Sequence, residues 1–155
     1  MRKFLLIICA VGLLISGCGE KSDLPTLKTE NIPVAKEKVL NKSIKIQVSG
    51  KIFKATLEDK RSARAFAEML PLEVEMTELN GNEKYFYLDD DLPTDSVRVM
   101  QIHAGDLMLY ESNCVVLFHK DFSTNESYTR LGKIDNPADL EKILGKDNVH
   151  IKFEE

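Results

Sequence analysis

The chain lacks the surplus of basic residues that proteins binding nucleic acid usually carry. Its 155 residues include 21 lysines and arginines against 25 aspartates and glutamates, a formal net charge of −4. This balance argues against nucleic acid as a partner and against electrostatic attachment to an anionic membrane surface. The sequence also has no internal repeat and no apolar run of membrane-spanning length. As a helix, the run from Phe4 to Ile15 would rise roughly 18 Å, well short of the ~30 Å of a bilayer core.

The first residues have the order of a secretory signal. Arg2 and Lys3 form a positive region, and the apolar stretch to Ile15 follows it. The stretch ends in Leu-Ile-Ser-Gly-Cys, which resembles the lipobox of bacterial lipoproteins. The resemblance implies a signal peptide over residues 1–17 and lipid, palmitate included, on Cys18; the alternative is an ordinary signal peptide with an incidental cysteine. We therefore expect a cell-envelope protein that is lipid-anchored to a membrane and faces the periplasm or the exterior.

Cysteine is too scarce for a disulfide scaffold. Of the three cysteines, Cys9 would leave with the signal and Cys18 would carry lipid, so only Cys114 remains. Cys114 opens an apolar run that ends at Phe118, which favours a small buried side chain over a nucleophile. Residues 18–41 are polar and contain Pro25 and Pro33, so we interpret them as a lipidated flexible tether. Residues 42–155 would then form one domain.

Alternating apolar and polar residues predict that this domain is mainly β. The predicted strands cover residues 44–48, 52–57, 72–76, 85–88, 97–103, 107–110, 114–118, 128–131 and 149–153. A helix is expected over residues 62–70, where Pro71 stops it, and a short final helix has Pro137 in its first turn and Gly145 after it. Many short strands separated by turn residues predict a closed or nearly closed antiparallel β-barrel with two short capping helices.

Five ordered blocks carry a resemblance to a known family. They are Leu70-Pro71-Leu72, Glu83-Lys84-Tyr85, residues 104–110, residues 115–118 and residues 127–132. Together they resemble the bacterial cyclophilin-like domain over nearly all of residues 43–153. The resemblance implies an eight-stranded barrel capped by two helices. Because that family is mostly uncharacterised, the resemblance implies a fold and no particular activity.

The residues argue against the prolyl isomerase activity of true cyclophilins. Those enzymes carry a Phe-His-Arg segment whose arginine polarises the prolyl amide, and this chain has no such segment. Of their Gln-Gly-Gly-Asp block only Gly105 and Asp106 remain, their Phe-Met-Ala-Asn segment is missing, and the chain has no tryptophan. Isomerisation requires a cation aimed at the amide, and the barrel alone does not supply one. A weak isomerase that uses Arg98 or Arg130 remains the alternative, as does a hydrolase that uses His103 and Asp106.

Six residues are candidates for a ligand site at the mouth of the barrel: Tyr85, His103, Asp106, Tyr110, Tyr128 and Arg130. Aromatic rings beside Glu83, Lys84 and Arg130 would suit an apolar or peptide-like ligand, although packing in the core explains tyrosines equally well. His103 and Asp106 could pair for proton transfer or metal binding, or His103 could simply end a strand.

No cofactor is expected. His119 and Asp121 supply too few ligands for zinc, and the aspartates at 89–91 lack the glycine and distal glutamate of a calcium loop. The sequence favours a non-catalytic binding or interaction module, held to a membrane through lipid on Cys18 and taking a peptide or small-molecule ligand. An inert spacer domain is the third possibility.

Overall fold

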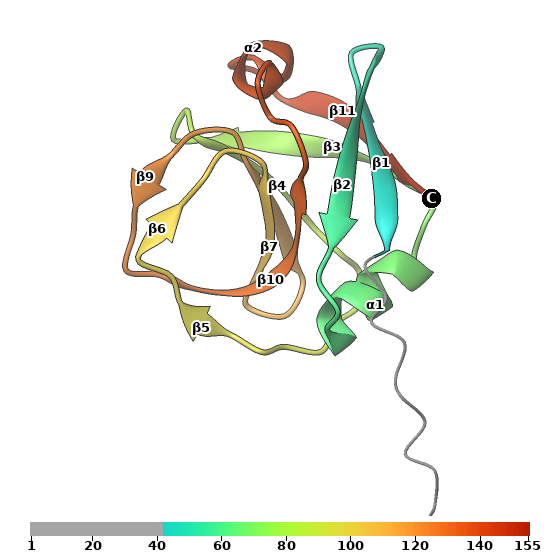
Figure 1. Cartoon of the computed structure of the whole chain (residues 1–155), viewed down its shortest axis with the longest axis vertical. Coiled ribbons are helices and arrows are strands. Elements are labelled where there is room, and N and C mark those ends of the chain that lie inside the picture. Colours follow the sequence, from blue (N-terminus) through green and yellow to red (C-terminus); the bar gives the residue numbers. More distant parts are fainter. Residues whose placement is uncertain (1–41) are drawn as a thin grey trace, which may run out of the picture. The chain divides into compact units, whose positions relative to one another are not determined.

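Eight antiparallel strands close into a barrel in the computed structural model, which describes residues 42–155 (Figure 1). In chain order they are β1 (Ser43–Val48), β2 (Lys51–Leu57), β3 (Leu72–Leu79), β4 (Glu83–Tyr87), β7 (Asp106–Tyr110), β8 (Cys114–Phe118), β10 (Ser127–Ile134) and β11 (Val149–Glu154). The hydrogen-bonded order is β2-β1-β11-β3-β4-β8-β7-β10, and pairing of β10 with β2 closes the ring. The prediction of a closed antiparallel barrel is confirmed.

Strand β10 is longer than predicted because it pairs with several neighbours along its length. Ser127 and Tyr128 pair with a short strand, β5 (Val97–Arg98), and the following residues pair with β7 and then with β2. The register shifts at Leu131, and at Gly132 the backbones come so close that an added Cβ would lie 2.5 Å from the Thr56 carbonyl oxygen. Glycine is the residue that permits this approach.

The predicted strand over residues 97–103 is wrong, because the chain changes partners within it. Two short strands replace it: β5, which pairs with β10, and β6 (Gln101–Ile102), which pairs with β9 (Phe122–Ser123). Between them Met100 is 63% exposed, whereas Val99 and Ile102 are buried. We refer to residues 97–103 and 122–126 together as the flap.

Two helices cap the ends of the barrel in the described part of the chain, as expected, although each is shorter than predicted (Figure 1). Helix α1 (Arg61–Glu68) ends two residues early, since the residue before Pro71 is disfavoured in helical conformation. It inserts Phe66 into the barrel, 5.6 Å from the ring of Phe153. Helix α2 (Leu140–Leu144) begins three residues after Pro137, and Gly145 follows it with φ +62°.

Alternation along each strand divides the apolar residues into two clusters. On β8, Val115 and Leu117 point into the barrel core, while Cys114, Val116 and Phe118 belong to a second cluster on the outer face. The outer cluster lies on β4, β7, β8 and β10 and is covered by the flap. The side of the barrel formed by β4, β7, β8 and β10 therefore has a second apolar cluster beneath the flap, outside the barrel core.

The signal peptide, the lipidation of Cys18 and the tether over residues 18–41 lie outside the described residues. Within residues 42–155, none of the helices has the length and apolar character needed to cross a membrane.

Candidate binding site

Strand β4 separates the residues that sequence reasoning had grouped together. Its side chains alternate, so Glu83, Tyr85 and Tyr87 lie on the outer face. Lys84 and Phe86 face the interior, where Phe86 joins the barrel core and Lys84 is fully buried. The tyrosines therefore lie on the outer face of the barrel wall, not at its mouth as predicted.

Strand register brings the tyrosines to one place on that face. Strand β8 lies between β4 and β7, and Cys114 is opposite both Tyr87 on β4 and Tyr110 on β7. The ring centroids of Tyr85 and Tyr87 are 5.7 Å apart, and those of Tyr110 and Tyr128 are 5.6 Å apart. The aromatic groups thus form two pairs with Cys114 between them.

The flap and the β3–β4 turn complete a pocket of about 410 Å³ over these rings. This outer-face pocket is lined by Leu79, Asn80, Asn82, Glu83, Tyr85, Tyr87, Tyr110, Cys114, Val116, Phe122, Thr124, Glu126 and Tyr128. Its size is within the range of small-molecule sites, ~300 to 1,000 Å³. Its aromatic walls are also typical of such sites, and Asn80, Asn82, Glu83, Thr124 and Glu126 add polar groups to the lining.

The outer-face pocket disfavours negative charge. Burial, together with the charge of Glu78, raises the pKa of Glu83 to about 6. Burial is also the main cause that raises the pKa of the Cys114 thiol to about 11 and that of Tyr128 to about 12, and Glu83 contributes to both. Cys114 is 4% exposed and protonated at neutral pH, so it is a poor nucleophile, as its apolar surroundings predicted.

The other three predicted residues form a separate group around Asp106. This carboxylate is 1% exposed and accepts the backbone N–H of His103 at 2.9 Å. Arg130 approaches it to 3.9 Å and Lys133 to 3.5 Å. The imidazole of His103 faces Asp121 instead, with Nδ1 3.6 Å from the carboxylate. The His103 and Asp106 side chains are therefore not paired for proton transfer, and Asp106 orders the turn between β6 and β7.

A third polar group closes the barrel at the α2 end and was not predicted. We define this barrel-end cluster as Glu78, Lys84 and His119. The Lys84 ammonium is 0% exposed, forms an ion pair with Glu78 and donates to the carbonyls of Gly145 at 3.1 Å and Asp147 at 2.7 Å. His119 is 4% exposed, lies 3.8 Å from Glu78 and has no hydrogen-bond partner at either ring nitrogen among the described residues.

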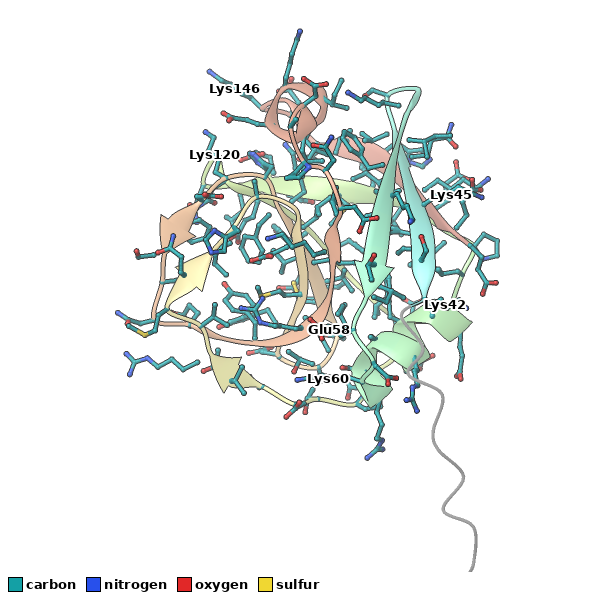
Figure 2. The ribbon with its side chains drawn as sticks, viewed as in Figure 1. Lys42, Lys45, Glu58, Lys60, Lys120 and Lys146 are labelled. Carbon is teal, nitrogen blue, oxygen red and sulfur yellow. The ribbon has the colours of Figure 1, made fainter. Side chains whose placement is uncertain are left out.

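An open hollow of about 770 Å³ adjoins this end, and lysines lie on its rim. Figure 2 shows Lys120 and Lys146 there, close to α2. Lys120 pairs with Glu141 at 3.2 Å. Within residues 42–155, no group of three or more histidine, cysteine, aspartate or glutamate side chains is placed to hold a metal ion.

Sequence reasoning missed Asn82 and Glu126 as pocket residues and treated Cys114 as core alone. Glu126 is on the flap, whose course follows from long-range pairing that periodicity does not reveal. The position of Glu83 could have been found, because the period of two on β4 places it with Tyr85 and apart from Lys84.

Comparison with known proteins agrees with the fold. The model of the cyclophilin-like family matches residues 46–154. A solution structure of a hypothetical protein from Archaeoglobus fulgidus is similar with a TM-score of 0.58 at 18% identity, over 77% of this chain and 98% of that one. At that identity the likeness concerns the fold alone. No curated protein sequence matches the chain. The family match extends over most of the chain, and the chain belongs to the cyclophilin-like family.

Proposed function

We propose that the protein is a lipid-anchored, non-catalytic binding module of the cell envelope. Its cyclophilin-like domain would take a peptide or small-molecule ligand in the outer-face pocket. The observation that carries this proposal is the convergence of four tyrosines, from β4, β7 and β10, on one open pocket of about 410 Å³. Tyr85, Tyr87 and Tyr110 keep exposed surface that a ligand can bury, whereas Tyr128 is itself buried.

Binding fits this pocket better than prolyl isomerisation does. An isomerase needs a cation directed at the prolyl amide, and the residues that line the outer-face pocket include no lysine, arginine or histidine. Arg130 lies beside Asp106, outside the lining, and Arg98 is exposed on the flap. A protease-coupled proline-peptide assay tests the point: turnover above buffer that is lost in Arg98→Ala or Arg130→Ala would favour the enzyme.

Ligand binding is tested on the full chain in mild detergent. A library of envelope peptides and metabolites is screened by thermal shift, and each hit is repeated with Tyr110→Ala and with Ile52→Ala as the control. Tyr110 lines the pocket and is 36% exposed, so its truncation should weaken binding with little loss of stability. Ile52 is 57% exposed on β2 and should leave binding unchanged. Hits that are equally weakened by both variants would contradict the pocket as the site.

The anchor is tested by fractionating cells that express Cys18→Ala or Cys114→Ala. We expect Cys18→Ala to lose lipid processing and to leave the membrane fraction, because a thioether-linked lipid would be its main attachment. Cys114→Ala is the matched control and should stay membrane-bound. Equal membrane retention and processing of Cys18→Ala would show that the lipoprotein interpretation is wrong.

A further inference from the structure

The outer-face pocket contains acidic charge and no base. Glu83 and Glu126 are the charged residues of its lining, and lysine, arginine and histidine are not part of it. The Glu83 carboxylate has neither a hydrogen bond nor an ion pair within residues 42–155, although Lys84 is its neighbour in sequence. Lys84 cannot balance it, because Lys84 points to the other face of β4 and is occupied by Glu78.

The hydrogen-bond acceptor that the pocket offers is the Glu83 carboxylate. Glu83 lines the pocket and is partly buried, so an ammonium group bound beside it would supply the hydrogen bonds and the opposite charge that it lacks. Asn82 also lines the pocket, but its Oδ1 atom is buried away from solvent.

Aromatic rings form the remaining walls. Tyr85 and Tyr87 stand on the side of Glu83, and Tyr110 and Tyr128 stand across β8. The faces of aromatic rings carry partial negative charge and attract organic cations. Acidic side chains, of which Glu83 has no partner in the described part of the chain, and aromatic walls therefore favour the same kind of ligand.

The titration of the lining supports a negative local field. The pKa values of Glu83, Cys114 and Tyr128 are all raised, and an acidic residue contributes to each rise, Glu78 at Glu83 and Glu83 at Cys114 and Tyr128. Burial contributes as well, and it is the main cause at Glu83, Cys114 and Tyr128. A site with this field repels anionic ligands and attracts cations.

We propose that the outer-face pocket binds primary alkylammonium groups, with the Glu83 carboxylate accepting hydrogen bonds from the ammonium and the tyrosines enclosing its alkyl chain. This inference rests on the proposed function and names the chemical class of its ligand. A volume of about 410 Å³ suits one small amine or one lysine side chain of a peptide. Both sources share the ammonium group and an alkyl chain.

The chain carries its own optical reporter for this test. It has no tryptophan and four tyrosines, and all four line the outer-face pocket. Tyrosine emission of the full chain in mild detergent therefore reports on this pocket. The probes are Nα-acetyl-lysine amide for the peptide source and 1,5-diaminopentane for the free amine. Nα-acetyl-norleucine amide keeps the alkyl chain without the ammonium, and the Nε-trimethyl form of the lysine amide keeps the charge without N–H donors.

We expect a saturable change in emission with at least one primary amine. The norleucine and trimethyl probes should bind about tenfold more weakly or worse, since a hydrogen bond between charged groups is lost. Glu83→Gln should weaken the amine about tenfold, and Glu126→Gln tests the acidic wall where the first variant fails to fold. Glu68→Gln, an exposed acid on α1, is the matched control and should change affinity less than about twofold.

Each other outcome overturns the inference. If norleucine amide binds as tightly as lysine amide, the pocket recognises apolar chains, and the proposed binding function survives without the cation. The same holds if neither amine binds while another screened ligand changes the emission. If the trimethyl form binds more tightly than the lysine amide, the pocket recognises quaternary ammonium groups, and the proposed ligand class is wrong. If no ligand of any class changes the emission, the inference and the proposed function both fail.

Discussion

The outer-face pocket and the barrel-end cluster contain two adjacent charged residues, Glu83 and Lys84, in opposite environments. The charge of Lys84 is paired, and that of Glu83 is not. Lys84 enters the barrel end, where its ammonium meets Glu78 and two backbone carbonyls and is shielded from solvent. Glu83 faces outward into a partly buried pocket and has no partner there. A buried charge with all its hydrogen bonds made serves the fold. A half-buried charge without them costs stability and is a reason to look for a ligand.

Lys84→Met should have the largest effect on stability. The substitution keeps the apolar stem but takes the ammonium away from two loop carbonyls and from the Glu78 carboxylate, which keeps only the N–H of Gly81, at a cost of about 3 kcal/mol or more. Urea unfolding followed by circular dichroism measures the loss. Lys146→Met, on the exposed rim shown in Figure 2, is the control and should cost less than about 0.5 kcal/mol.

The double variant Lys84→Met with Glu78→Met sharpens the same comparison. Once both charges are removed, no buried carboxylate is left unpaired, so the double variant should be more stable than Lys84→Met alone. A double variant that loses the sum of both single effects would mean that the pair acts through packing, and the contrast between the two regions would then lose its electrostatic basis.

His119 should make the barrel end sensitive to acid. Burial, together with the nearby ammonium of Lys84, lowers its pKa below the ordinary 6.5 despite the opposing charge of Glu78. The unfolded chain therefore binds more protons than the folded chain once the pH falls below about 6.5, and stability is lost as the pH falls through that value toward the folded pKa. His119→Leu should flatten this loss and cost little at pH 7, since the ring nitrogens have no partners among the described residues.

Urea midpoints at several pH values between 7 and 5 test this prediction, with His150→Leu as the control. His150 is exposed and lies 2.9 Å from Glu73 on the barrel surface. If His150→Leu flattens the acid loss and His119→Leu does not, the buried imidazole is not its source.

The barrel itself could be predicted from the sequence because alternation and turns are local signals. The burial alternation on β1 and the run from Cys114 to Phe118 match what their residue patterns predict. The flap could not be predicted in this way, since its course depends on the pairing of Gln101 with Ser123 across a long loop. The pocket could therefore be predicted only in part. The strands that carry its tyrosines follow from residue patterns, but the flap that completes it does not.

For the candidate site residues, too, long-range pairing decided which side chains lie together. Tyr85, Tyr110 and Tyr128 meet because β8 separates β4 from β7, an order that only the closed sheet establishes. His103 and Asp106 are close in sequence, yet the turn between them uses the Asp106 carboxylate to accept a backbone N–H. Proximity in sequence was thus a poor guide to which polar side chains pair.

Glu83 should show the opposite pH response from His119, with a smaller effect. Its pKa in the folded chain is about 6, above the ordinary 4.5, so the folded state binds more protons between these values. Stability contributed by this group is therefore present below pH 4.5 and is lost as the pH rises through about 6. Glu83→Gln should be more stable than the wild type at pH 7 and equal to it near pH 4, as measured by urea unfolding; Glu68→Gln should be unchanged at both.

The last prediction concerns the reactivity of the Cys114 thiol and involves no change in stability. It tests whether the outer-face pocket contains a reactive nucleophile. Burial raises the pKa of its thiol from 9.0 to about 11, with Glu83 and Glu111 adding to the rise and the Tyr87 hydroxyl opposing it. At pH 8 this shift alone reduces the thiolate fraction roughly 100-fold, so alkylation by iodoacetamide should be slow in the folded chain and fast in urea. Mass spectrometry of the Cys9→Ala, Cys18→Ala chain follows this single thiol. Rapid labelling in the folded chain would identify an accessible thiolate, and the pocket would then hold a nucleophile where we propose only binding.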